Sequence, residues 1–265
     1  MKLGLTGRTA LVTGGSAGIG KAAALALAQE GATVVIASRS QENLDTARDE
    51  ISSFSGCSVQ TVVCDVSDLT ALHNLIGEIT DQNGGLDVLI NNAHFIPRTH
   101  SKRDAKFEDY PLDLWDNTIA INLRGLFLCC QEIGKVMLTQ KKGVIINVSS
   151  IYGIIGADQR IYGESRLNSP AFYAATKGAM VNLTKHLAAY WQGKNIRVNT
   201  LTLGGVFDEV LHQDKKFIKN YSKKTILGRM ANKEDYDGPL LFLSSNASSY
   251  MTGANLIIDG GWTAW

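Results

Sequence analysis

The 265-residue sequence predicts a doubly wound α/β fold in one domain, residues 1–265, on three observations. Short runs rich in Val, Ile and Leu recur along the whole chain, helical patterns separate them, and a glycine-rich turn follows the first run. Apolar runs of this length, without the alternation of a half-exposed strand, indicate strands that are buried on both faces. We therefore expect a parallel sheet of about seven strands with helices on both faces.

Strands and helices alternate in order along the chain. The expected strands are Thr9–Thr13, Thr33–Ala37, Ser58–Val63, Leu86–Asn91, Val144–Ser149, Ile196–Leu201 and Leu256–Asp259. The expected helices are Ile19–Glu30, Glu42–Ser52, Leu69–Asp81, Leu114–Leu138, Ala171–Gln192 and Glu234–Leu243. Two segments are less regular, Phe95–Pro111 and Gly204–Lys224. Both follow the carboxyl end of an expected strand, which is where doubly wound sheets bind their ligands.

The composition argues against several classes of partner. The net charge of +1 gives no overall reason to bind nucleic acid or an acidic membrane surface. No run approaches the roughly 18 apolar residues of a membrane span, and the N-terminus has no export signal. The four cysteines lack the spacing of a metal site. We expect a cytoplasmic protein with reduced thiols, no metal and a small-molecule substrate.

The turn after the first expected strand, in "TALVTGGSAGIGKA", places Gly14, Gly18 and Gly20 before the first helix. Glycines allow a tight turn and a close approach of the backbone to a ligand, and the free N–H groups of a helix N-terminus favour a pyrophosphate. A glycine triplet between a strand and a helix therefore predicts a dinucleotide site. The alternative is a turn of the same shape that binds nothing.

Three tyrosines lie between residues 149 and 178, and one of them has the surroundings of a catalytic acid. A free phenol titrates near pH 10, so proton exchange near neutral pH needs a nearby cation or the positive end of a helix. Tyr173 has Lys177 four residues later, on the same helix face. We expect that helix to begin at Pro170, with Ser169 as its N-cap.

These motifs together resemble the short-chain dehydrogenase/reductase family over almost the whole chain. They are the GxxxGxG turn, "NNA" at Asn91–Ala93, "YAATK" at Tyr173–Lys177 and "YMTGANLIIDGG" at Tyr250–Gly261. The resemblance implies a Rossmann-type fold and a nicotinamide cofactor. The cofactor-binding residues that it implies are Gly14, Ser16, Gly18, Ile19, Gly20, Ser38, Arg39, Asp65, Val66, Asn92, Ala93, Tyr173, Lys177, Gly204 and Val206.

The chain departs from the family pattern at three positions. His94 stands where glycine is usual, Leu203 replaces the proline that usually precedes Gly204, and Asp208 stands near a usual threonine. In the family pattern Asp65 contacts the adenine, and the backbone of Val206 contacts the nicotinamide carboxamide. We expect these departures to alter cofactor affinity.

The residues after the second expected strand favour NADP(H) over NAD(H). Relatives that use NAD usually have an Asp there, whereas this chain has Ser38 followed by Arg39. A guanidinium can pair with a 2′-phosphate and gains nothing comparable from a bare ribose. Against this, Ala17 stands where some NADP-using relatives have a second basic residue, and Arg39 is alternatively an ordinary surface residue.

The resemblance also implies a catalytic group of Asn122, Ser150, Tyr173 and Lys177. Ser150, in preference to its neighbour Ser149, would hold the substrate oxygen, and Tyr173 would exchange its proton. Lys177 would hold the nicotinamide ribose and lower the pKa of the phenol. Asn122 would support an ordered water in a proton relay.

Ser150 and Tyr173 are further apart than is usual in the family, because residues 157–170, "ADQRIYGESRLNSP", are inserted between them. We call this segment the insert. Its hydrogen-bonding groups favour a hydroxyl-rich or anionic substrate, since each polar group taken from water needs a partner. The alternative is a solvated loop. The candidate substrate residues are His94, Arg98, Tyr152, Arg160 and Arg166. Arg98 belongs to the segment Phe95–Pro111, which is rich in basic residues and follows the fourth expected strand. Tyr162 is expected to line the substrate site or to pack.

The sequence is therefore compatible with three functions. The first is an NAD(P)-dependent oxidoreductase acting on a sugar, sugar acid or sugar nucleotide, because "SSIYG", "FEDYPLDLWDNTIAINLRGLFLCCQ" and "RVNTLTLGGVFD" resemble a branch associated with bacterial surface-polysaccharide and nonulosonic-acid synthesis. The others are a 3-oxoacyl-thioester reductase and a weakly catalytic cofactor-binding regulatory subunit. The family resemblance also implies a homotetramer or homodimer built on the fourth and fifth helices.

Overall fold

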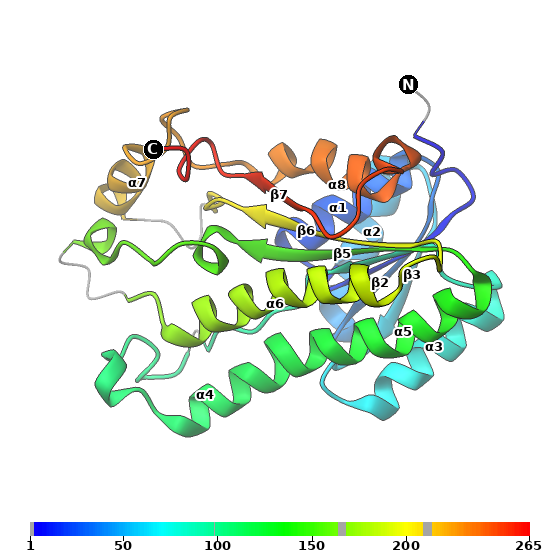
Figure 1. Ribbon diagram of the computed structural model, residues 1–265, viewed down its shortest axis with the longest axis horizontal. Coiled ribbons are helices and arrows are strands. Elements are labelled where there is room, and N and C mark those ends of the chain that lie inside the picture. Colours follow the sequence, from blue (N-terminus) through cyan, green and yellow to red (C-terminus); the bar gives the residue numbers. More distant parts are fainter. Residues whose placement is uncertain (1–2, 98, 164–167, 209–213) are drawn as a thin grey trace.

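Seven parallel strands form one sheet, as the sequence predicts (Figure 1). The structure, a computed structural model, describes residues 3–97, 99–163, 168–208 and 214–265. The strands are β1 (Thr9–Thr13), β2 (Thr33–Ser38), β3 (Val59–Val63), β4 (Val88–Asn91), β5 (Gly143–Ser150), β6 (Ile196–Leu203) and β7 (Asn255–Ile258). Their order across the sheet is β3-β2-β1-β4-β5-β6-β7. This is the doubly wound arrangement expected from the continuous apolar runs.

Helices cover both faces of the sheet (Figure 1). They are α1 (Gly18–Gln29), α2 (Gln41–Ser55), α3 (Leu69–Asn83), α4 (Leu112–Ile119), α5 (Leu126–Gln140), α6 (Ala171–Tyr190), α7 (Lys215–Ser222) and α8 (Asp237–Ser244). Residues of α1, α2 and α8 pack in one core cluster, and residues of α3, α5 and α6 pack in a second cluster on the opposite face.

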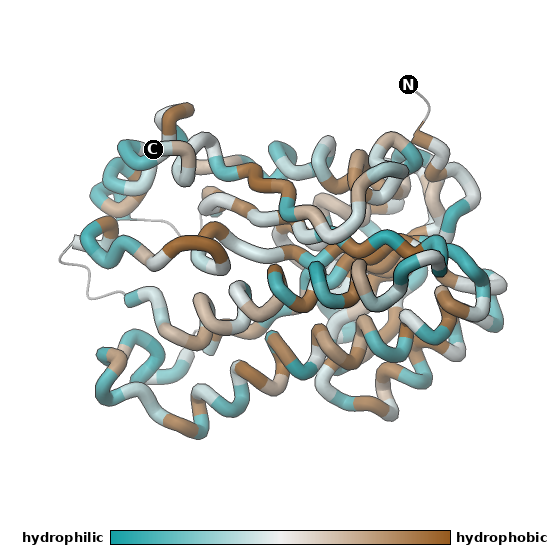
Figure 2. The backbone as a smooth tube through the Cα atoms, viewed as in Figure 1, coloured by the Kyte–Doolittle hydropathy of each residue, from teal (hydrophilic) through white to brown (hydrophobic). Residues whose placement is uncertain are grey.

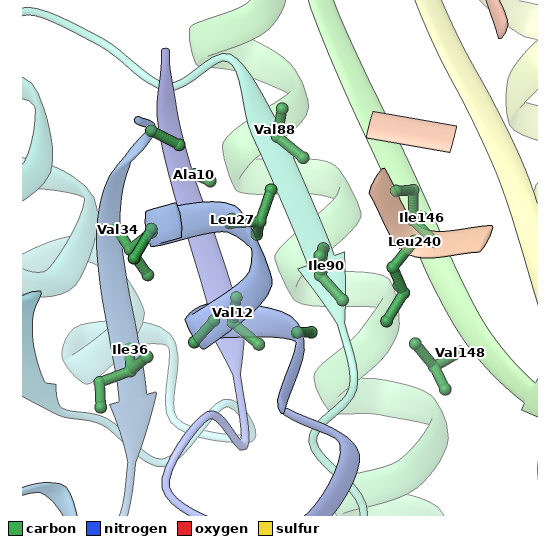
Figure 3. Close-up of a cluster of buried hydrophobic side chains, with 14 of the residues drawn as sticks. Ala10, Val12, Leu27, Val34, Ile36, Val88, Ile90, Ile146, Val148 and Leu240 are labelled. Carbon is green, nitrogen blue, oxygen red and sulfur yellow. The ribbon is translucent and has the colours of Figure 1, made fainter. Parts of the chain in front are cut away.

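The strands alternate their side chains between these two clusters. In β1, Ala10 and Val12 belong to the first cluster and Leu11 belongs to the second. Figure 3 shows the first cluster, with Leu27 of α1 and Leu240 of α8 over the strands. The hydrophobic segments of the chain gather along the sheet, and the hydrophilic ones lie on outward helix surfaces (Figure 2). Burial on both faces explains why the strands read as unbroken apolar runs.

The order of the sheet places a crevice at its carboxyl edge. β1 pairs with β2 on one side and with β4 on the other, so the connections after β1 and β4 leave the sheet on opposite faces. Ligands of doubly wound sheets bind outside the strand ends at such a switch point. Gly14, Ser38 and Ser150 lie at or directly after strand ends on this edge.

The structure corrects several element boundaries. The expected single helix Leu114–Leu138 begins at Leu112 and ends at Gln140, and its middle, Ala120–Gly125, is a π-helical turn. The expected strands also shift by a few residues; β6, for example, continues to Leu203. A π-helical turn inside a helix, like that at Ala120–Gly125, is frequent at functional sites.

Two other expectations about the helices were wrong. The segment Gly204–Lys224, expected to be irregular, contains α7. Pro170, and not Ser169, is the N-cap residue of α6, and no side chain caps this helix. The Ser169 backbone N–H instead bonds to Gln159 Oε1 at 3.1 Å, which holds Ser169 within the insert.

No helix in the described part of the chain is both long enough and apolar enough to cross a membrane. All four cysteines are free thiols, and three of them are buried. Within the same residues, no three His, Cys, Asp or Glu side chains are grouped so that they could hold a metal ion.

Candidate active site

A cleft of about 390 Å³ lies at the carboxyl edge of the sheet, around the glycine turn. The ends of β1, β2, β3 and β4 all contribute to it. The predicted cofactor residues that line this cofactor cleft are Gly14, Ser16, Gly18, Ile19, Ser38, Arg39, Asp65, Val66, Asn92 and Ala93. His94 and Asp208, two of the three departures from the family pattern, line it as well.

Two glycines of the turn, Gly14 and Gly20, are packed too closely for any other residue. A Cβ on Gly14, whose φ is +65°, would lie 2.9 Å from the Cα of Ala93. A Cβ on Gly20 would lie 2.3 Å from the carbonyl oxygen of Gly14. Gly20 does not line the cleft, so its role is to let α1 approach the turn.

Asn92 fastens this turn to the end of β4. Its Nδ2 donates to the carbonyl oxygens of Thr13 and Gly14 at 3.2 and 3.1 Å. In return, the Thr13 hydroxyl accepts hydrogen bonds from the backbone N–H groups of Asn92 and Ala93, both at 3.1 Å. The turn is therefore held in shape by the protein itself.

The N-terminus of α1 opens toward the cofactor cleft with unsatisfied backbone donors. Its N-cap residue, Ala17, offers no side-chain cap, and the first turn of the helix has no acidic residue. A Cβ on Gly18 would meet no atom within 4 Å, so the loop face is open there. Free N–H groups, the helix dipole and an open glycine face fit the pyrophosphate of a dinucleotide.

The adenosine end of the cofactor cleft carries a carboxylate and a guanidinium. Asp65 Oδ1 accepts hydrogen bonds from the backbone N–H and hydroxyl of Ser67 at 2.9 and 2.6 Å, which fixes this carboxylate beyond β3. The exposed Arg39 lies with its Cζ 5.5 Å from the centroid of the Phe95 ring. No described residue accepts a hydrogen bond from its guanidinium.

A second cavity of about 330 Å³, the catalytic cavity, continues from the first. Ile19, Asn92 and His94 line both. Ser150, Tyr173, Lys177, Gly204 and Val206 line the catalytic cavity, so the structure brings together the predicted serine, tyrosine and lysine from β5 and α6.

The three predicted catalytic side chains are linked by short contacts. Ser150 and Tyr173 line the same cavity, and the Ser150 side chain acts to lower the pKa of Tyr173, which burial raises. The Lys177 ammonium donates to the carbonyl oxygen of Val148 at 2.7 Å and lies 5.9 Å from the centroid of the Tyr173 ring. Tyr152 meets Tyr173 edge to face at 6.4 Å between centroids.

The pKa values correct one expectation from the sequence. Burial raises the pKa of Tyr173, and the Ser150 side chain opposes that rise, whereas the sequence predicts a phenol pKa lowered by Lys177. Burial also lowers the pKa of Lys177 to about 8. The reason is that the ammonium is bonded to a backbone carbonyl and not to the phenol, so the desolvation of both groups dominates.

The depressed pKa of Lys177 makes the stability of the protein depend on pH. Between about pH 8 and the ordinary lysine value of 10.5, the unfolded chain binds a proton that folded Lys177 has lost. This group therefore adds stability as the pH rises, and that stability is lost as the pH falls through 8. We expect the free energy of unfolding to rise between pH 7 and pH 9.5 by about 2 kcal/mol more in the wild type than in Lys177→Met.

Urea unfolding at the two pH values measures this difference. Lys185→Met, at an exposed lysine of the same helix, is the control and should not change the pH dependence. Parallel pH profiles for the wild type and Lys177→Met would show that Lys177 keeps its proton throughout this range.

Asn122 lines neither cavity, but its side chain holds the backbone of Phe95, which follows His94 in the chain. It is buried in the π-helical turn with 3% of its surface exposed. Its Oδ1 accepts from the backbone N–H of Phe95 at 2.6 Å, and its Nδ2 donates to the Phe95 carbonyl oxygen at 3.0 Å. Asn122 thus fixes the chain that follows His94.

The described residues of the insert, 157–163 and 168–170, include contacts of Ile161 and Tyr162 with α7. Asp158 pairs with Lys224 at 2.8 Å and with Arg160 at 2.7 Å, and these bonds hold the pKa of its carboxyl well below the usual range. The Arg160 side chain is 85% exposed and does not line the catalytic cavity, so its contact with substrate stays a prediction. The other two predicted arginines, Arg98 and Arg166, lie outside the described residues.

Four aromatic side chains line one part of the catalytic cavity, and two of them, Phe217 and Tyr221, were not predicted from the sequence. Tyr162 of the insert stacks on Phe217 of α7, with ring centroids 5.5 Å apart. Besides burial, Tyr162 is among the groups that raise the pKa of Tyr152, and the Tyr221 hydroxyl accepts from the backbone N–H of Gly205. All four rings line the cavity. The one signal in the sequence was the helical spacing of Phe217 and Tyr221.

Known proteins resemble this chain along nearly its full length. The model of a family described as enoyl-(acyl carrier protein) reductase matches residues 14–263. A 2-dehydro-3-deoxy-D-gluconate 5-dehydrogenase of Pseudoalteromonas atlantica is 36% identical, with 98% of each chain covered. A 3-oxoacyl-(acyl-carrier-protein) reductase of Thermotoga maritima is 35% identical, with 97% of this chain and 98% of that protein covered.

A solved structure shows the same agreement in three dimensions. The gluconate 5-dehydrogenase of Burkholderia cenocepacia, in complex with NADP and tartrate, superimposes with a TM-score of 0.88 and is 31% identical. The match covers 100% of this chain and 98% of that one. Together with the glycine turn and the cavity behind it, these matches show that the chain belongs to the short-chain dehydrogenase/reductase family, as an NAD(P)-dependent oxidoreductase that acts on CH–OH groups.

Proposed function

We propose that this protein is an NADP(H)-dependent oxidoreductase that interconverts an alcohol and a carbonyl group on a sugar acid or related polyhydroxylated substrate. The observation that carries the proposal is the meeting of Ser150, Tyr173 and Lys177 in a cavity that continues from the cofactor cleft. These intact residues also argue against a regulatory subunit without catalysis.

Each residue has a role that follows from its position. The nicotinamide cofactor supplies the hydride donor or acceptor. The Ser150 hydroxyl would hold the substrate oxygen, and Tyr173, which lines the same cavity, would give or take the proton of that oxygen. Lys177 would hold the nicotinamide ribose and place a positive charge beside the phenol. Asn122 would act indirectly, by fixing the chain at Phe95.

The residues that line the two cavities suggest the remaining cofactor contacts. The free N–H groups at the start of α1 would hold the pyrophosphate, and Asp65 with Val66 would contact the adenine. Gly204 and Val206 line the catalytic cavity, where the nicotinamide carboxamide would lie. At the adenosine end, Ser38 stands in the place of the carboxylate that favours NAD and is followed by Arg39, which supports NADP(H).

The lining of the catalytic cavity supports a hydroxyl-rich substrate. Besides Ser149, five hydroxyl-bearing residues among those described line it, and they are Ser150, Tyr152, Tyr162, Tyr173 and Tyr221. Such a wall offers hydrogen-bond partners to a polyol chain, whose polar groups are costly to bury without them. A sugar nucleotide of surface-polysaccharide synthesis remains a hypothesis within this class. The similarity to the Thermotoga maritima reductase keeps an acyl thioester as the second candidate.

A substrate panel tests the proposal. We expect NADPH oxidation with keto acids of sugars, or NADP⁺ reduction with gluconate and a hexitol, to be faster than any reaction with acetoacetyl thioesters. Sugar nucleotides with a keto group form the third arm of the panel. Turnover with acetoacetyl thioesters alone would refute the sugar-acid assignment and establish the reductase alternative.

We also propose that the protein forms a homodimer or homotetramer through the face of α4, α5 and α6. Ile119, Leu123, Phe127 and Leu183 line a hollow of about 620 Å³ on this face. Phe127 is 46% exposed in the single chain, and a second copy on this face would remove it from water.

A further inference from the structure

We propose that Phe95 is a cofactor-specificity residue, whose ring is a platform that holds the Arg39 guanidinium ready for a 2′-phosphate. The inference rests on the proposed preference for NADP(H). It adds a residue that no sequence motif singles out, in a loop that follows β4 and not β2.

Arg39 is placed between two hollows of the surface. It lines the cofactor cleft and also an adjoining groove of about 860 Å³ that includes Phe95, His100 and Arg124. Its Cζ lies 5.5 Å from the centroid of the Phe95 ring, within the range of a cation–π contact. A stacked guanidinium uses its face, so its N–H groups, which point outward in its plane, stay available for a phosphate.

The platform is rigid because its backbone is fixed independently of the ring. Both polar backbone groups of Phe95 bond to the side chain of buried Asn122, at 2.6 and 3.0 Å. Asn122 itself is part of the π-helical turn between α4 and α5. A change of the Phe95 side chain therefore leaves these bonds possible, so that the ring can be tested apart from the backbone.

A platform of this kind acts on affinity through preorganisation. An exposed arginine samples many rotamers, and a phosphate must select the one that reaches it. A cation–π contact at an exposed site corresponds to roughly a 2- to 5-fold effect on an equilibrium constant. Because NAD(H) has no 2′-phosphate, this gain applies to NADP(H) alone.

Calorimetric binding to the substrate-free protein tests this inference without any turnover. We expect Phe95→Leu to raise the Kd for NADP⁺ and for 2′,5′-ADP by roughly 2- to 5-fold and to leave the Kd for NAD⁺ unchanged. Phe95→Trp should keep the Kd for NADP⁺ at the wild-type value, since indole is the best cation–π partner. Phe107→Leu, at a 75% exposed phenylalanine of the same loop, is the matched control.

Arg39→Ala separates failure of this inference from failure of the proposed cofactor preference. If Arg39→Ala leaves the Kd for NADP⁺ unchanged, the NADP(H) preference itself is wrong. If Arg39→Ala weakens NADP⁺ binding but Phe95→Leu does not, or weakens NAD⁺ equally, the platform role is overturned. In the double variant, Phe95→Leu should add nothing to the effect of Arg39→Ala, and additive effects would show that the ring acts without the guanidinium.

Discussion

Tyr173→Phe is expected to lower kcat by about two to four orders of magnitude while the Kd for NADP(H) stays within a few-fold of the wild type. The phenol lines the same cavity as Ser150 and lies on the same helix face as Lys177. Without its hydroxyl, no group remains at that position to exchange a proton with the substrate oxygen. The ring keeps its contact with Tyr152, so the cavity should retain its shape.

Steady-state kinetics combined with cofactor binding measures the effect. Tyr250→Phe is the matched control, because Tyr250 is fully exposed and removal of its hydroxyl should leave kcat unchanged. Near-normal turnover of Tyr173→Phe would mean that another group exchanges the proton. The neighbouring phenol of Tyr152 would then be the first to test, since it lies in the same cavity.

Arg39→Ala is expected to lower kcat/KM for NADP(H) by roughly 10- to 100-fold and to change that for NAD(H) by less than about 2-fold. The magnitude corresponds to the loss of about 1.5–3 kcal/mol, which is typical of hydrogen bonds to a charged group. The described residues offer this guanidinium a ring to stack on and no acceptor, so its donors remain for the cofactor. The loss should fall mainly on KM, because the 2′-phosphate lies far from the reacting carbon.

The wild-type enzyme must first be compared with both cofactors. Arg48→Ala on α2, at an exposed arginine paired with Asp45, is the control for the loss of a positive charge. A higher kcat/KM of the wild type with NAD(H), together with unchanged NADP(H) kinetics of Arg39→Ala, would contradict the assignment.

The sheet could be predicted because strands that are buried on both faces consist of continuous apolar runs. All seven expected strands form the sheet, whereas α7 was missed. α7 is short, and its apolar residues Phe217, Ile218 and Tyr221 pack with the insert and not on the sheet. The periodicity of such a helix is too brief to stand out from the surrounding polar residues.

The candidate site was predicted only where its residues are tied together locally. Tyr173 and Lys177 share a helix face by their spacing, and the glycine turn depends on φ values and close approaches that only glycine allows. The ion pair of Arg160 with Asp158, a side chain of the same segment, was not predicted. Sequence spacing cannot show which of several acceptors a long cationic side chain reaches.

The sequence by itself determined the doubly wound sheet, the dinucleotide turn and the tyrosine–lysine pair, because each follows from backbone periodicity or from the geometry of neighbouring residues. Only the tertiary structure decided that Lys177 bonds to Val148, that the insert rests on α7, and that Arg39 stacks on Phe95. These contacts join residues far apart in the chain, whose distances are set by the packing of the whole sheet and its helices. Cofactor preference and substrate choice depend on contacts of this second kind.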